Sequence, residues 1–182
     1  TDDVDIGPNG VIYFSDASEK FGINNYREDL FEHRPHGKIL SYDPTMDKLT
    51  TLLDSLYFAN GVAVEPNGNF LLFNETATYE VSKLWLKGPK AGTREKIIIN
   101  LPGFPDGIST GSNGIYWIAI ASTRNAVVDG LAGKPFWRKI IMRLPLFMQP
   151  APVRHGFVLG IDGKGNVIHN LQDPDLESYS PI

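Results

Sequence analysis

Short apolar runs that each follow an Asn-Gly pair recur three times along the chain. The runs are Val11–Phe14 after Asn9-Gly10, Phe70–Phe73 after Asn67-Gly68, and Ile115–Ile118 after Asn113-Gly114. Asn-Gly between apolar runs indicates a β-hairpin, because both central residues of a type I′ turn need positive φ. The pattern therefore predicts three tight hairpins of antiparallel strands.

A second strand–turn–strand pattern follows each of these hairpins. Its turns are Asp43–Asp47, Gly88–Gly92 and Asp162–Gly165. The glycines of the first turns, Gly10, Gly68 and Gly114, are 58 and 46 residues apart. Repeats of roughly 40–50 residues built from four strands are typical of propeller blades. The predicted fold class is therefore all-β, a partial β-propeller over residues 1–182 with blade units at about 1–58, 59–104 and 105–182.

Two long connections interrupt the strands, over residues 17–36 and 123–155. Both follow the second strand of a unit, so we expect both on the same face of the propeller, where long loops often carry function. The first predicts a short helix over 25–33. The second contains a basic amphipathic stretch, 134–148, which can make peripheral contact with a membrane or pack across the propeller face. We favour packing.

Three blades do not close a ring, since propellers carry at least four. We expect the remaining blades of a larger protein, or a second copy of this chain, to complete it.

Composition narrows the function classes. The 182 residues carry a net charge of −4, which argues against a nucleic-acid partner because phosphate binding needs a basic surface. The chain contains no cysteine, which excludes disulfides, thiol nucleophiles and zinc–thiolate sites. No run of about 18 apolar residues indicates a transmembrane segment. The cellular compartment stays open.

One oxygen-bearing side chain occupies the same place in every unit, eight positions before the turn glycine. These residues are Asp2, Asn60 and Asp106. The first strand of each blade lines the central channel, so the three should meet at one mouth of it. Two carboxylates and an amide oxygen are hard ligands that suit Ca²⁺. The alternative is structural, since Asn and Asp favour turns and strand starts by bonding to nearby backbone.

Several motifs together resemble the strictosidine synthase-like family, in particular its adipocyte plasma membrane-associated protein branch. They are Gly10–Ser18, Phe58–Val62, Asn74-Glu75-Thr76, Leu101–Gly107, Tyr116–Ile118, Arg124-Asn125, Lys134–Trp137 and Asp173-Pro174-Asp175. This family is similar to the calcium-dependent gluconolactonase and paraoxonase propellers, which are six-bladed. The resemblance implies a calcium ion held by Asp2, Asn60 and Asp106, with Asp2 where the family usually has Asn. The Glu ligand of the family's first blade would lie before residue 1.

The resemblance also implies an activity, the calcium-assisted hydrolysis of small esters or lactones, as in arylesterases and lactonases. Asp106 or a loop histidine, His155, would steer the attacking water and serve as catalytic residues. Two alternatives stay open. One is the metal-free condensation of an amine with an aldehyde, for which strictosidine synthases use a glutamate that would fall just beyond Ile182. The other is a non-catalytic propeller that binds a partner.

Overall fold

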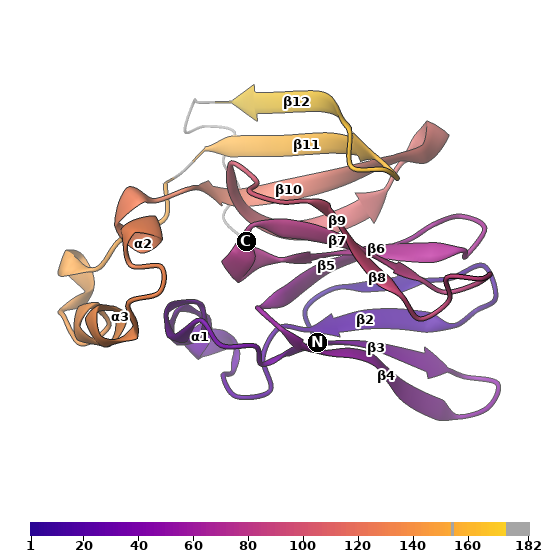
Figure 1. Ribbon diagram of the computed structural model, residues 1–182, viewed down its shortest axis with the longest axis horizontal. Coiled ribbons are helices and arrows are strands. Elements are labelled where there is room, and N and C mark those ends of the chain that lie inside the picture. The colour runs from indigo at the N-terminus through magenta and orange to yellow at the C-terminus, as the bar shows by residue number, and fades with distance from the viewer. Residues whose placement is uncertain (154, 174–182) are drawn as a thin grey trace.

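The computed structural model describes residues 1–153 and 155–173 and contains three four-stranded antiparallel sheets (Figure 1). Each sheet is a meander whose strands neighbour one another in chain order. The first comprises β1 (Val4–Ile6), β2 (Ile12–Asp16), β3 (Gly37–Asp43) and β4 (Lys48–Leu56). The second comprises β5 (Ala59–Val64), β6 (Phe70–Glu75), β7 (Glu80–Trp85) and β8 (Arg94–Ile98). The third comprises β9 (Gly103–Thr110), β10 (Ile115–Thr123), β11 (Gly156–Asp162) and β12 (Val167–Asp173). The predicted all-β propeller is confirmed.

The middle sheet is buried on both faces, because it lies between the other two (Figure 1). Side chains of a strand alternate between the two faces of its sheet. Accordingly, Leu71 and Phe73 of β6 pack in the apolar cluster shared with the first sheet, whereas Leu72 packs in the cluster shared with the third. This explains the uninterrupted apolar run over 70–73, which is typical of a strand with no solvent-facing side.

Two of the three Asn-Gly turns differ from the predicted type I′ geometry. Gly10 and Gly68 have positive φ, but Asn113 is the only one of the three turn asparagines with positive φ. The first two turns contain Pro before the Asn, and Pro favours the second position of a type I turn, after which a left-handed glycine completes a three-residue hairpin loop. Both turns close accordingly, with the amide of the glycine donating to the carbonyl of the residue three positions before it, Gly7 or Glu65.

The long connections hold the helices, and the prediction that both lie on one face is confirmed (Figure 1). The first contains a 3₁₀ turn, Ile23–Asn25, and α1 (Tyr26–Glu32). The second contains α2 (Ala126–Gly130), α3 (Pro135–Ile141) and a 3₁₀ turn, Leu146–Met148. Further 3₁₀ turns span Thr76–Thr78 and Ser112–Gly114. Helix α1 contacts α3, so the two connections meet beside one end of the sheets (Figure 1).

In the basic amphipathic stretch 134–148, helix α3 ends at Ile141, and its buried side carries a charged residue. Phe136 and Trp137 are 68 % and 56 % exposed, whereas Arg138 is 7 % exposed. The favoured packing of this stretch on the propeller face therefore does not extend to Phe136 and Trp137. The inward side is fixed by Arg138, whose Nε donates to the carbonyl of Leu131 at 2.8 Å. Membrane contact through this segment stays a prediction.

None of the helices in the described part of the chain has the length and apolarity needed to cross a bilayer.

The inner strands of adjacent sheets are joined by side chains that bond to backbone. Oδ2 of Asp3 accepts from the amide of Val62 at 2.9 Å, and Oδ2 of Asp5 accepts from the amide of Val64 at 2.7 Å. Between the second and third sheets the backbones themselves come close at Gly61. A Cβ at this position would lie 2.4 Å from the Ile108 nitrogen. Glycine is thus required where β5 meets β9.

The close approach at Gly61 generates a stability prediction. Gly61→Ala should destabilise the intact protein by about 1–3 kcal/mol, because the added methyl group forces the two strands apart. Urea denaturation measures this effect. Gly107→Ala is the matched control, since a Cβ there meets nothing within 4 Å. Equal midpoints for the two variants would show that β5 and β9 tolerate separation.

Candidate functional site

A cavity of about 680 Å³ lies at the face that carries the long connections, and all four predicted site residues line it: Asp2, Asn60, Asp106 and His155. Asn60 is in β5 and Asp106 is in β9, whereas Asp2 lies two residues before the start of β1. The repeat-based placement of these residues at one mouth therefore agrees with the cavity they share. Their roles as ligands or catalysts stay predictions.

Asn60 and Asp106 are in direct contact. Nδ2 of Asn60 donates to Oδ1 of Asp106 at 2.7 Å and to Oγ1 of Thr76 at 3.2 Å. The Thr76 hydroxyl donates its single proton to the carbonyl of Pro105 at 2.6 Å, so toward Asn60 it can only accept. This fixes the orientation of the amide. Oδ1 of Asn60 forms no hydrogen bond within the described part of the chain, and is available to a ligand.

The backbone around Asp106 is held on both sides. The carbonyl of Asp106 accepts from Nδ2 of Asn74 at 2.6 Å, and the neighbouring carbonyl of Pro105 accepts from Thr76. Register shifts in the pairing of β9 with β10 fall between Ile108 and Pro105 and between Pro105 and Phe104, so Asp106 lies within the first of them. Such irregularities re-aim side chains at the edge of a sheet. Pro105 is tolerated because β9 is an edge strand of its sheet.

The two carboxylates of the site repel each other's charge. The pKa of Asp2 is raised from 3.8 to about 6, first by loss of hydration in the cavity and then by the charge of Asp106. Burial also raises the pKa of Asp106, although the hydrogen bond from Asn60 opposes the shift. Hard oxygen donors that are partly desolvated and mutually repulsive are the donor set that a divalent cation relieves. The residues present therefore fit Ca²⁺.

His155 lines the same cavity, but its hydrogen bond goes elsewhere. Its Nε2 lies 3.0 Å from Oε1 of Gln172, and its ring meets Phe157 edge-on with centroids 5.9 Å apart. An amide oxygen only accepts, so Nε2 carries the proton and Nδ1 of the neutral ring carries the lone pair. The histidine is thus oriented by Gln172, in the tautomer that leaves Nδ1 free to accept a proton.

The long connections close the cavity over the sheets. Nη2 of Arg27, just inside α1, donates to the carbonyl of Pro150 at 3.1 Å and so ties the first connection to the second. The amide of Val153 donates to Oγ of Ser122 at 2.9 Å, which anchors the second connection to β10. Arg27 and Ser122 themselves line the cavity. Sequence reasoning missed both, because neither belongs to the repeat; their only signal was their place in or next to the long connections.

Glu75, at the end of β6, has a structural role. It is 3 % exposed, accepts from the amide of Tyr57 at 2.8 Å and forms an ion pair with Arg94. Both of its oxygens are therefore used: one binds Tyr57, between β4 and β5, and the other binds Arg94 of β8. The next residue, Thr76, is the one that reaches the cavity.

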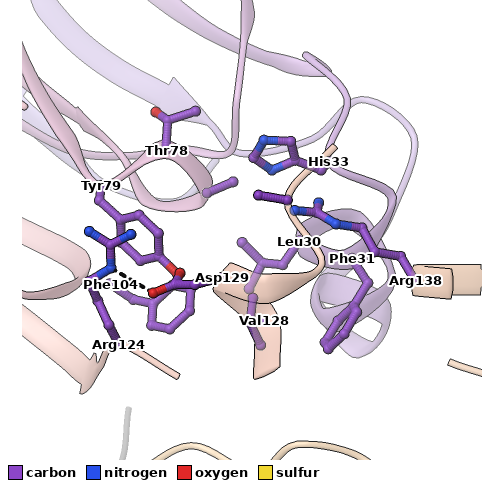
Figure 2. Close-up of a pocket in the computed structure, with 12 residues that line it drawn as sticks. Leu30, Phe31, His33, Thr78, Tyr79, Phe104, Arg124, Val128, Asp129 and Arg138 are labelled. Carbon is purple, nitrogen blue, oxygen red and sulfur yellow. Dashed lines mark hydrogen bonds and ion pairs between the residues drawn. The ribbon is translucent and has the colours of Figure 1, made fainter. Parts of the chain in front are cut away.

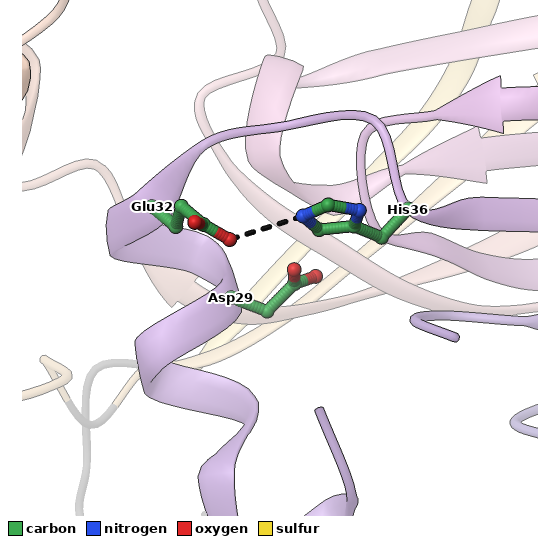
Figure 3. A group of neighbouring side chains, drawn as sticks. All are labelled: Asp29, Glu32 and His36. Atoms are coloured by element: carbon green, nitrogen blue, oxygen red, sulfur yellow. Dashed lines mark hydrogen bonds and ion pairs between the residues drawn. The ribbon is translucent and has the colours of Figure 1, made fainter. Parts of the chain in front are cut away.

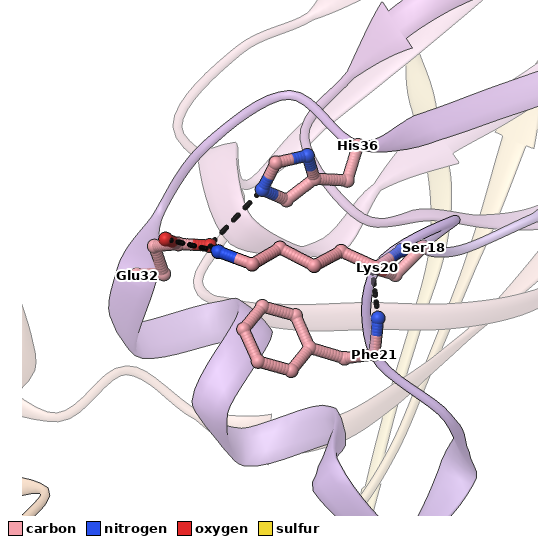
Figure 4. A network of polar contacts seen from close by, with 5 residues as sticks. All are labelled: Ser18, Lys20, Phe21, Glu32 and His36. Atoms are coloured by element: carbon pink, nitrogen blue, oxygen red, sulfur yellow. Dashed lines mark hydrogen bonds and ion pairs between the residues drawn. The ribbon is translucent and has the colours of Figure 1, made fainter.

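A second polar cluster lies on α1, away from the repeat-derived site. One ligand atom each of Asp29, Glu32 and His36 falls within 4.8 Å of the other two (Figure 3). However, Nζ of Lys20 lies 2.5 and 2.7 Å from the two Glu32 oxygens, and Nε2 of His36 lies 3.0 Å from one of them (Figure 4). Burial raises the pKa of Asp29 to about 6, and the charge of His36 opposes this. The cluster is a network of polar contacts that fastens α1 to the start of β3.

Comparison with known proteins confirms the predicted family resemblance. The family model "Strictosidine synthase" matches residues 2–89. Protein strictosidine synthase-like 6 of Arabidopsis thaliana is 38 % identical over 96 % of this chain and 47 % of its own length. The adipocyte plasma membrane-associated protein of Rattus norvegicus is 34 % identical over 90 % of this chain and 45 % of its own length. The chain thus spans about half the length of the curated relatives it matches.

Solved structures confirm the fold. Regucalcin from Agrobacterium tumefaciens, described as a calcium-binding protein, superposes with a TM-score of 0.57 at 16 % identity, covering 92 % of this chain and 43 % of its own. A gluconolactonase from Xanthomonas campestris gives 0.58 at 14 % identity, covering 94 % of this chain and 46 % of its own. These neighbours are six-bladed propellers, and the three sheets described above correspond to part of such a ring.

The raised pKa of Asp2 generates a prediction about pH. In the presence of a chelator, the folded state should bind more protons than the unfolded state between about pH 4 and 6, so its stability should fall as the pH rises through this window. Asp2→Asn should remove this part of the slope and raise stability at pH 7 by on the order of 1 kcal/mol, since the open cavity screens the charge. Thermal unfolding of both proteins at several pH values measures it.

Asp29 contributes a slope of the same sign, so only the difference between wild type and Asp2→Asn is informative. Identical pH profiles for the two proteins would mean that the Asp2 carboxyl is fully hydrated.

Proposed function

We propose that the protein carrying this chain hydrolyses small esters or lactones at the mouth of the propeller, with Ca²⁺ bound by Asp2, Asn60 and Asp106. The observation that carries the proposal is the contact between Asn60 and Asp106 within one cavity, where the Asn60 oxygen is left available. The likeness to a calcium-binding regucalcin and to a gluconolactonase supports it at the level of fold. When bound, the ion would polarise the substrate carbonyl and stabilise negative charge on its oxygen.

The residues of this chain divide the remaining work. Asn60 and the backbone contacts of Asn74 and Thr76 hold the Asp106 carboxylate in place. His155 accepts a proton at Nδ1 from the attacking water, since its Nε2 is engaged by Gln172. The water oxygen bonds to the acyl carbon, the bond from this carbon to the alkoxy oxygen breaks, and the proton passes from His155 to that oxygen.

The shape and lining of the cavity favour a small and largely apolar substrate. Its volume of about 680 Å³ is in the range of small-molecule sites, roughly 300–1,000 Å³. Apolar side chains from all of the surrounding segments line it, among them Ile23, Phe58, Phe104, Ile120, Pro152 and Phe157. Such walls bind hydrocarbon surface without selecting a particular polar group, as expected for an enzyme that accepts aryl esters or lactones.

Removing the charge of one ligand should weaken calcium binding while the fold is kept. Asp106→Asn keeps an oxygen that can accept from Asn60 but removes an anionic donor, so calcium affinity should drop by on the order of tenfold or more. Hydrolysis of phenyl acetate or a γ-lactone should fall with it, and added calcium should restore part of the rate by mass action. Calcium titration followed by calorimetry, together with initial rates, measures both effects.

Asp54→Asn is the matched control, because it removes the same charge from an exposed position on β4 outside the cavity. Full hydrolytic activity of Asp106→Asn in the presence of a chelator would contradict the proposal and would favour metal-free chemistry such as the amine–aldehyde condensation.

The role of His155 is tested separately. His155→Gln should leave calcium affinity unchanged within about twofold while lowering kcat by about 10²–10⁴-fold, the usual contribution of a general base. If His155 is the base, the acidic limb of the wild-type pH–rate profile should vanish in the variant. Unchanged kcat with an unchanged pH profile would assign the proton transfer to another group.

A further inference from the structure

A smaller cavity of about 270 Å³ lies beside the main one, between the two long connections (Figure 2). Leu30, Phe104 and Val128 line both cavities. The two connections supply most of its lining, the rest comes from Ala77–Tyr79 and Phe104, and no residue of the proposed calcium site lines it. Its volume suits a small ligand or one end of a larger one.

Arg138 brings a positive charge into this cavity with little solvent around it. It is 7 % exposed and comes from α3, and Figure 2 shows its guanidinium directed toward the interior between Leu30 and His33. Its Nε donates to the Leu131 carbonyl, but its two terminal nitrogens make no hydrogen bond or ion pair among the described residues. These nitrogens are not fully buried and so can reach a ligand in the cavity, while the partial loss of hydration around the charge favours an anionic partner.

The acidic side chain that lines this cavity, Asp129, already has two hydrogen-bond partners. Oδ2 of Asp129 accepts from Nε of Arg124 at 2.9 Å, and its Oδ1 accepts from the Tyr79 hydroxyl at 3.0 Å (Figure 2). The Arg124 guanidinium also lies over the Tyr79 ring, 4.3 Å from its centroid. This group is therefore self-contained, and its one negative charge is matched by Arg124. With Arg138 added, the lining of the cavity carries a net positive charge.

His33 adds a neutral polar group to the same wall. It lies in the left-handed conformation that ends α1, and its ring packs against Tyr57 with centroids 5.1 Å apart. Burial and then the charge of Arg138 lower its pKa, so at pH 7 its ring is uncharged. A neutral imidazole beside a guanidinium can donate one hydrogen bond to an oxyanion, while the guanidinium remains the charged partner of that anion.

We propose that the cavity around Arg138 binds a small oxyanion, a carboxylate or a phosphate group, through the two terminal nitrogens of the guanidinium. Arginine presents these nitrogens as a planar fork that matches both groups. A carboxylate could be the acid released by hydrolysis in the adjacent cavity, in which case the inference rests on the proposed function. A phosphate would come from a phosphorylated small molecule. The shared chemistry is the same for both.

Titration with two simple anions tests the proposal. Inorganic phosphate and acetate are added separately to the intact protein, in chelator and at constant ionic strength, and binding is followed by calorimetry and thermal unfolding. We expect saturable binding of at least one anion, weakened on the order of 30-fold or more in Arg138→Met, which leaves the anion without its charged partner. Chelator removes any contribution of calcium, so this result and that of the hydrolysis assay are independent.

Lys139→Met is the matched control, because it removes the neighbouring positive charge from the exposed side of the same helix; it should bind both anions like wild type. Preference for acetate indicates a carboxylate ligand, and preference for phosphate indicates a phosphorylated one. If Arg138→Met does not fold, Arg138→Lys replaces it and should bind several-fold more weakly than wild type. No saturable binding to wild type, or equal affinity in the Arg138 variant, would overturn the proposal.

Discussion

The close approach of β5 and β9 at Gly61 is the constraint on which the rest of the structure depends. Only a residue without a side chain lets the Ile108 nitrogen and the Asp106 carbonyl come this near. The same approach brings Asn60 within hydrogen-bond distance of Asp106 and lets Asn74 and Thr76 bond to the β9 backbone. The contact that packs the second sheet against the third therefore also forms the candidate site, because Asn60, the candidate ligand, is next to Gly61.

The middle sheet makes this arrangement rigid. Because both of its faces are buried, its strands have no solvent-facing side onto which they can relax. The first sheet is fastened to it by Asp3 and Asp5, whose carboxylates bond to alternate amides of β5. Asp2 and Asp3 lie in the extended segment just before β1, and alternation of side chains along it leaves Asp2 on the opposite side from Asp3, where it faces the cavity. Two neighbouring carboxylates thus serve different purposes, one structural and one exposed to a ligand.

Much of this was predictable because it follows the repeat. The positions of Asp2, Asn60 and Asp106 relative to a turn glycine are equal, and equal positions in stacked units converge on one axis. The turn types were less predictable. All three turns contain Asn-Gly, but Pro8 and Pro66 change the backbone geometry of the first two. Glu75 could not be assigned from sequence, because its partners Tyr57 and Arg94 are distant along the chain.

The long connections were the least predictable part, and the reason lies in Arg138. The amphipathic pattern of 134–148 leads to the expectation that its apolar residues pack inward, yet helix α3 buries Arg138 and leaves the rings of Phe136 and Trp137 exposed. Helical periodicity predicts which apolar residues are buried. It fails for a polar residue such as Arg138, which we propose is buried to bind a ligand. Such a failure is expected where binding rather than stability selects the residue. The acidic residues at the channel mouth and the basic residue under the connections then give two adjacent cavities opposite charge, one suited to a cation and the other to an anion.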